Sequence, residues 1–170
     1  GPSVPTNWTK GFGPFEHVRM LHPLNSTDGH GRRGTVSFGQ RVPDYERQWR
    51  EWTADIAEAP HIARDLVRSG EAEDFYVSQN SFNGWRRIAS LSALGACYTD
   101  IDYRTRKTHA GKPVEAIAEG VLRTLDDNGV PPPSYIMATG RGLCVAWLHD
   151  LLPRRALPRW QAIQGRLAAI

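Results

Sequence analysis

Two kinds of apolar pattern recur along the chain and predict its elements. Short runs rich in strand-forming residues predict five strands, at residues 35–38, 75–78, 96–103, 134–137 and 143–148. Apolar residues at helical spacing predict helices at residues 43–69, 113–128 and 157–170, and a short helix within residues 85–94. Residues 1–34 show little periodicity and predict an irregular arm.

The longest helical pattern, residues 43–69, contains a proline. Asp44 beside Pro43 is a plausible helix start. Pro60 is expected to break the stretch into two helices, because proline lacks a backbone donor and its ring clashes with the preceding turn. Trp49 and Trp52 fit the core-facing side of the first helix.

The second half of the chain reads as strand, helix, strand, turn, strand, helix. Its last two strands are close enough to form a hairpin. This order predicts an α/β (α+β) fold, in which flanking helices cover a mixed sheet with an RRM-like or ferredoxin-like layer. We expect residues 1–72 to form an arm and a helical segment that pack on a catalytic core of residues 73–170.

Composition narrows the class of protein. With 170 residues, of which 40% are hydrophobic, the chain can bury one core. No apolar run approaches the length that spans a bilayer, so no membrane partner is expected. The two cysteines, Cys97 and Cys144, are too few for a disulfide framework or a multi-cysteine zinc site, and they favour a reduced, cytoplasmic protein.

Basic residues occur in clusters, although the net charge of +3 does not by itself indicate nucleic acid. Clusters on several loops could follow a phosphate backbone, but charge alone favours an ordinary solvated surface. Trp85 precedes one cluster and could stack on a base, although packing in the core is the more common use of a tryptophan. The clusters are Arg32 and Arg33; Arg86 and Arg87; Arg104, Arg106 and Lys107; and Arg154, Arg155 and Arg159.

The triplet Asp100-Ile101-Asp102 ends one of the predicted strands. Alternate strand residues face the same way, so the two aspartates share one face with Cα atoms about 7 Å apart. Two carboxylates this close repel, and Mg²⁺ or Mn²⁺ would remove the repulsion because these hard cations prefer oxygen ligands. The alternative is a strand that ends in a polar turn, with both acids in water or paired with Arg104 and Arg106.

The turn Thr139-Gly140-Arg141-Gly142 lies between the last two predicted strands. Glycines permit a tight turn and a close approach of the backbone to a ligand. N–H groups in such a turn can cradle phosphate oxygens, and Arg141 could add a bidentate contact. The alternative is a plain hairpin turn with an exposed arginine, and the spacing is neither that of a P-loop nor that of a dinucleotide fingerprint.

Together, the order of these motifs resembles the catalytic core of archaeo-eukaryotic primases, especially the plasmid and mobile-element branch. In that family an apolar strand ending in Asp-x-Asp supplies two metal ligands, here Asp100 and Asp102. A later turn leads into a strand with a tryptophan, here Trp147, and helps to hold the phosphates of the incoming nucleotide. The resemblance covers roughly residues 74–160. It implies nucleotide binding at Thr139, Gly140, Arg141, Gly142 and Cys144.

Two departures from the family's pattern stand out. Cys144 lies where the family often carries a histidine, and a cysteine is a poor substitute for histidine as a hydrogen-bond donor to a phosphate. The family's third metal-binding acid lies beyond a further helix, and this chain stops in that helix at Ile170. We therefore expect the catalytic core to be truncated at its C-terminal end, since Asp150 does not fit the pattern.

The resemblance implies a DNA primase or polymerase in the replication of a plasmid or mobile element. Such an enzyme transfers nucleotidyl groups from NTP or dNTP on a single-stranded DNA template, and it uses a two-metal site of Mg²⁺ or Mn²⁺. A helicase or another replication domain would be a natural partner. The residues expected to contact the template are Trp85, Arg86, Arg87, Arg104, Arg106 and Lys107.

Two alternatives remain open at this point. The same fold could serve as a non-catalytic DNA-binding module of a replication initiator whose metal site is degenerate. Some glycosyltransferases also end a strand in Asp-x-Asp and use it to hold a metal–diphosphate. The scattered arginine clusters favour nucleic acid over a nucleotide-sugar donor.

Overall fold

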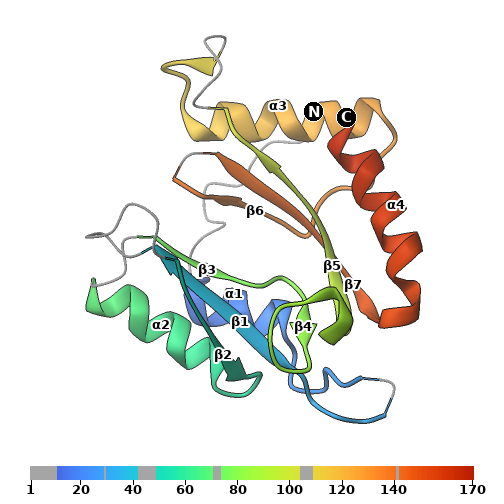
Figure 1. Ribbon diagram of the computed structural model, residues 1–170. Coiled ribbons are helices and arrows are strands. Elements are labelled where there is room, and N and C mark those ends of the chain that lie inside the picture. Colours follow the sequence, from blue (N-terminus) through green and yellow to red (C-terminus); the bar gives the residue numbers. More distant parts are fainter. Residues whose placement is uncertain (1–10, 29, 42–48, 71–73, 104–108, 141) are drawn as a thin grey trace. The chain divides into compact units, whose positions relative to one another are not determined.

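The computed structural model describes residues 11–28, 30–41, 49–70, 74–103, 109–140 and 142–170. Within these ranges the chain forms four α-helices and a seven-stranded antiparallel sheet, so the predicted α/β class is confirmed (Figure 1). The strand order is β2-β1-β4-β5-β7-β6, and β3 pairs with β1. The helices are α1 (Pro14–Leu21), α2 (Ala59–Ser69), α3 (Val114–Asp127) and α4 (Leu157–Ala168). The strands are β1 (Thr35–Arg41), β2 (Trp49–Asp55), β3 (Phe75–Val77), β4 (Ser81–Phe82), β5 (Leu91–Ile101), β6 (Tyr135–Ala138) and β7 (Leu143–Pro153).

The described residues divide into two compact units. The first unit comprises residues 11–95 and 150–157, and the second comprises residues 96–149 and 158–170. The expected division of the chain into an arm and helical segment (residues 1–72) and a catalytic core (residues 73–170) stays a prediction. Within the described residues, no helix is both long and apolar enough to cross a membrane.

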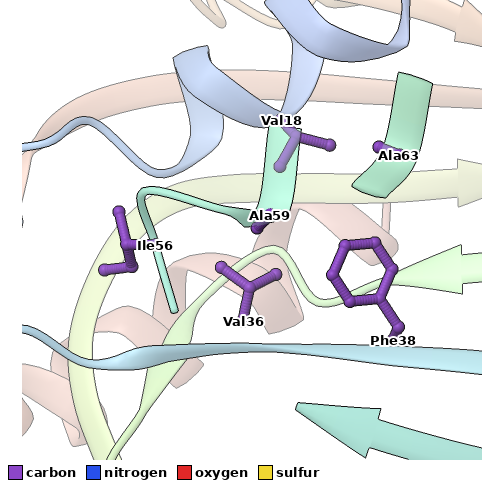
Figure 2. Packing of buried hydrophobic residues seen from close by; sticks show 6 residues of the cluster. All are labelled: Val18, Val36, Phe38, Ile56, Ala59 and Ala63. Carbon is purple, nitrogen blue, oxygen red and sulfur yellow. The ribbon is translucent and has the colours of Figure 1, made fainter. Parts of the chain in front are cut away.

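Strand β1 organises the first unit, because it pairs antiparallel with β2, β3 and β4. Its residues Val36 and Phe38 are fully buried and point toward the two helices α1 and α2 (Figure 2). They pack there against Val18 of α1, the segment that leads into α2, and α2 itself. Burial of such apolar side chains is the main force that holds the helices on this face of the sheet. The cluster consists of Val18, Val36, Phe38, Ile56, Ala59 and Ala63.

The prediction of a helix over residues 43–69 was wrong for its first part. Residues 49–55 form strand β2, whose pairing with β1 places Trp52 directly opposite Phe38. The rings of Trp52 and Phe38 stack at 5.6 Å between centroids and 11° between planes. The helix starts only at Ala59, and Pro60 lies in its first turn, where its missing N–H costs no hydrogen bond. The expected start at Pro43 and Asp44 lies outside the described residues.

Two further elements differ from the prediction. Helix α1 lies within the expected irregular arm, where the Gly13 N–H donates to Glu16 Oε2 at 2.9 Å and Pro14 opens the helix. Instead of a short helix within residues 85–94, a single 3-10 turn at Ile88–Ser90 leads directly into β5. Strand β5 therefore begins at Leu91, five residues before the expected start.

The second unit follows the prediction closely. Helix α3 ends just before Gly129, whose positive φ of +65° suits the left-handed stop that glycine provides. Strands β6 and β7 form the expected antiparallel hairpin, with Tyr135 opposite Ala146 and Ala138 opposite Leu143. Helix α3 lies beside this hairpin (Figure 1). The two pack together through Ile117, Ala118 and Leu143.

The two tryptophans of β2 give a direct test of its structure. An odd spacing places Trp49 and Trp52 on opposite faces of a strand, whereas a helix would bring them together on one side. We expect Trp52→Ala to lower the free energy of unfolding by about 3 kcal/mol, and Trp49→Ala by about 1 kcal/mol or less. Urea denaturation of both variants measures the difference, and equal losses would contradict the strand.

His22 is a buried histidine directly after α1. Its side chain is 1% exposed, and its Nε2 donates a 2.6 Å hydrogen bond to the carbonyl oxygen of Ser78. Burial lowers the pKa of His22 to about 4; the bond to Ser78 opposes this shift, while the positive charges of His17 and Arg19 add to it. The imidazole of His22 is therefore neutral at pH 7.

This histidine predicts a loss of stability in mild acid. Below pH 6.5 the unfolded chain binds a proton at His22 that the folded chain does not bind until about pH 4, so stability rises with pH between these values. Since one pH unit corresponds to about 1.4 kcal/mol per titrating group, the full loss is about 3 kcal/mol and is complete below about pH 4. Urea denaturation of the wild type and His22→Gln across this range checks it, and identical slopes of stability against pH would refute the assignment.

Candidate nucleotide and metal site

The carboxylate pair lies where β5 emerges from the interior. The first seven residues of β5 are buried, Tyr98 and Thr99 are half-buried, and Asp100 is exposed. Asp102 follows the end of the strand and is also exposed, while Ile101 between them is half-buried. Asp100 and Asp102 are thus both solvated. That their side chains share one face stays a prediction, because Asp102 lies beyond the end of the strand.

Gly142 brings the β6–β7 turn directly against this pair. A Cβ atom added at Gly142 would overlap the carbonyl oxygen of Ile101 and would lie 3.1 Å from the Cα atom of Asp102. Only glycine permits this approach, because every other residue carries the Cβ atom. The two motifs, which are about 40 residues apart in the sequence, thus meet in the fold.

The turn is closed by its own hydrogen bonds. The Thr139 N–H donates to the carbonyl oxygen of Gly142 at 2.9 Å, and the Gly142 N–H donates to Thr139 Oγ1 at 3.1 Å. Gly140 has φ of +81°, a conformation that favours glycine. Arg141, the predicted phosphate contact, lies outside the described residues.

Two side chains of the β6–β7 hairpin lie on the sheet face opposite α3. Leu143 and Ile136 face α3, so alternation places Cys144 and Tyr135 on the other face. Burial raises the pKa of Tyr135 well above its usual range, and electrostatic interactions with Cys144 and Asp100 raise it further. Tyr135 is therefore a protonated phenol within the electrostatic influence of Asp100.

Cys144 is placed in the interior of the second unit. Its side chain is 2% exposed and lies opposite Met137 in the β6–β7 pairing. Its predicted part in nucleotide binding stays a prediction. Both cysteines are buried and neither forms a disulfide, and burial raises the pKa of the Cys97 thiol, so neither has the exposed thiolate that reactive cysteines need.

Helix α4 holds the strand edge just before the pair. Trp160 Nε1 donates to the carbonyl oxygen of Ala96 at 2.8 Å, and the Tyr98 N–H donates to Gln164 Oε1 at 2.8 Å. Trp160 and Gln164 are four residues apart and lie on the same side of α4. These bonds hold the backbone of β5 four and two residues before Asp100, and the ring centroids of Trp160 and Tyr98 lie 6.2 Å apart.

The residues present fit a divalent cation that a substrate helps to bind. In the part of the chain that the structure describes, no group of three or more His, Cys, Asp or Glu side chains is gathered closely enough to hold a metal ion. Mg²⁺ is commonly held by one or two carboxylates together with substrate phosphates, however, and Asp100 and Asp102 supply that number.

The predicted nucleic-acid contacts fall in two places. Trp85, Arg86 and Arg87 lie in the first unit, where all three are exposed. Trp85 is 57% exposed, so it is not the core residue that was the alternative. The second cluster, Arg104, Arg106 and Lys107, lies outside the described residues, and so does its alternative role as ion-pair partner of the two aspartates.

Tyr135, Trp160 and Gln164 were not predicted to take part in the site. Tyr135 could have been found from strand alternation, because it lies on the same face as Cys144 across the predicted hairpin. Trp160 and Gln164 carry a helical spacing, but the strand edge that they bind is about 65 residues away in the sequence. Nothing in the local pattern indicates that partner.

A curated protein of Clostridium perfringens named "Replication protein" is similar to this chain. The two are 28% identical over 154 residues, which cover 90% of this chain and 35% of that protein. The chain thus spans about a third of the length of this relative. No family model matches the chain, and no solved structure matches it.

The close approach at Gly142 predicts an unusual cost for a small substitution. Gly142→Ala should lower the free energy of unfolding by about 1–3 kcal/mol, because the new methyl group overlaps the backbone of Ile101. Gly120→Ala in α3 is the matched control, since a Cβ atom there meets nothing within 4 Å, and it should raise stability by about 0.5–1 kcal/mol. Chemical denaturation compares the two, and a neutral Gly142→Ala would show that the turn does not touch the strand.

Proposed function

We propose that this chain is the nucleotidyltransferase part of a replication protein, a DNA primase or polymerase that joins NTP or dNTP units on a single-stranded DNA template. The observation that carries the proposal is the contact of the Thr139–Gly142 turn with the backbone between Asp100 and Asp102. That contact puts a candidate phosphate-binding turn beside a candidate metal-binding pair. The similarity to the Clostridium perfringens "Replication protein" supports a role in replication.

The proposed reaction has few covalent demands on the protein. The oxygen of a 3′-hydroxyl bonds to the α-phosphorus of the nucleotide as the bond to the bridging oxygen breaks, pyrophosphate leaves, and the hydroxyl proton passes to solvent. A cation held by Asp100 and Asp102 would neutralise the triphosphate and activate the hydroxyl. The chain itself contributes mainly by positioning and by its electrostatic field.

Positioning falls to three parts of the second unit. Helix α4 holds the backbone of β5 at Ala96 and Tyr98, just before Asp100 and Asp102. The Gly142 N–H is already donated to Thr139 Oγ1, so the turn's phosphate contacts would come from the backbone of Gly140 and from Arg141. Tyr135 remains a neutral hydrogen-bond donor on the face that carries Asp100.

A second candidate function is DNA binding without catalysis, as in a replication-initiator module. The observation in its favour is that no third metal-ligating side chain gathers with Asp100 and Asp102 in the described ranges. The two candidates differ in one measurable property, since only the enzyme has to bind a metal–nucleotide at the pair.

We expect calorimetry to detect binding of a nucleoside triphosphate with Mn²⁺ to the wild type, and none to Asp100→Asn/Asp102→Asn. The amides keep the shape of the side chains but remove the charge that holds the cation. Asp126→Asn/Asp127→Asn is the matched control, because this exposed acidic pair lies at the end of α3 in the same unit.

The outcomes separate the candidates. Binding that is lost only in the Asp100/Asp102 variant supports the nucleotidyltransferase, and primer synthesis should then be assayed on a template. Binding that survives in that variant places the nucleotide elsewhere. If the wild type binds no metal–nucleotide, the catalytic proposal fails and DNA binding alone becomes the account to pursue.

A further inference from the structure

Two exposed aromatic rings lie on the outer face of the first unit's sheet, opposite α1 and α2. Trp49 is 48% exposed and Tyr76 is 52% exposed, and their ring centroids are 5.3 Å apart. In the pairing of β1 with β3, Tyr76 lies directly opposite Gly39, so Tyr76 and Gly39 share one face of the sheet. That face is the one turned away from Phe38 and the buried cluster.

Gly39 allows the indole of Trp49 to pack directly on the backbone of β1. A Cβ atom at Gly39 would overlap atoms of the Trp49 ring, which therefore occupies the space where a side chain would otherwise stand. The indole is thus supported from below while about half of its surface stays in water. Contiguous exposed apolar groups, unlike single exposed side chains, are a mark of a binding surface.

Cations flank the two rings. Arg41 lies opposite Trp49 in the pairing of β1 with β2 and is exposed, so its side chain shares the outer face. Arg86 Nε lies 3.5 Å from Glu51 Oε1, and Glu51 is held in turn by the Ser37 hydroxyl at 2.9 Å. Glu51 pairs with Gly39, whose backbone carries the Trp49 indole, so the Arg86 guanidinium contacts a residue of the same outer face.

The loop that carries Arg86 is tied to the same face. Thr35 Oγ1 lies 3.0 Å from the carbonyl oxygen of Phe82 and 2.9 Å from that of Gly84. The loop also presents Trp85, the most exposed tryptophan of the described residues, and Arg87. Aromatic rings and arginines thus alternate within one surface.

We infer that this outer face, defined by Trp49, Tyr76, Arg41 and Arg86, binds single-stranded nucleic acid. Bases stack on the two rings, and the guanidinium groups contact phosphates. Flat rings accept any base, and flanking cations follow the backbone, which is the chemistry of single-strand binding without sequence preference. The inference rests on the proposed function for the choice of DNA and deepens it by naming where the template strand binds.

The test is fluorescence anisotropy of a dye-labelled oligodeoxythymidylate in EDTA, without nucleotide. We expect Trp49→Leu and Tyr76→Ala each to weaken binding by about 5- to 150-fold, and Trp49→Phe to keep most of it, because leucine fills space but cannot stack. Arg86→Ala should weaken binding and reduce the slope of log affinity against log salt by about 0.7.

Matched controls lie elsewhere on the first unit. Phe12→Ala removes a ring that is 42% exposed at the start of α1, and Arg68→Ala removes an exposed arginine at the end of α2. Both should bind the oligonucleotide as the wild type does. Asp100→Asn/Asp102→Asn should also bind it normally, so loss of the metal–nucleotide site and loss of this surface are read separately.

Three results would overturn the inference. The first is a wild type that does not bind the single strand, and the second is Trp49→Leu and Tyr76→Ala variants that bind like the controls while thermal unfolding shows them folded. The third is a wild-type dimer in sedimentation that Trp49→Leu converts to a monomer with unchanged DNA binding, since the face would then be a contact between two copies of the chain.

Discussion

The candidate site depends on one backbone contact, the approach of Gly142 to Ile101 and Asp102. It brings the Thr139–Gly142 turn against Asp100 and Asp102, and neither motif taken singly indicates a binding site. Any side chain at Gly142 would push the turn away by the width of a methyl group, a displacement large enough to matter where reacting groups must be held closely. The constraint therefore lies in backbone geometry, and the functional side chains are built on it.

Both acids stay in water, which has a consequence for ligand binding. Exposed carboxylates repel each other weakly because the solvent screens them, so little strain is stored in the pair. The free-energy cost of the pair without a bound cation is therefore also small. Under the proposed function, Asp100 and Asp102 would bind a cation weakly until a triphosphate supplies further oxygen ligands, and metal and nucleotide would bind together.

The sequence was informative where a signal is local. Strand-forming residues predicted the second half of β5 up to its exposed end at Asp100, and helical periodicity with Gly129 predicted α3. Helix α1 has the residues of a helix start at Pro14 and Glu16, but it was not predicted because residues 1–34 show little helical periodicity. Strand β2 could not be predicted in this way, because its conformation is set by pairing with β1 and by the stack of Trp52 on Phe38. The meeting of the turn with the acids likewise depends on a contact about 40 residues apart in sequence, which no spacing reveals.

The hydrogen bonds that Trp160 and Gln164 form with β5 have a second consequence, which concerns aggregation. Beyond its short pairing with β4, strand β5 would offer bare N–H and C=O groups on one side, and such groups recruit strands from other molecules into aggregates. The indole and amide of α4 occupy these groups at Ala96 and Tyr98. The strand end that bears the acids can therefore stay open to solvent without becoming a seed for aggregation.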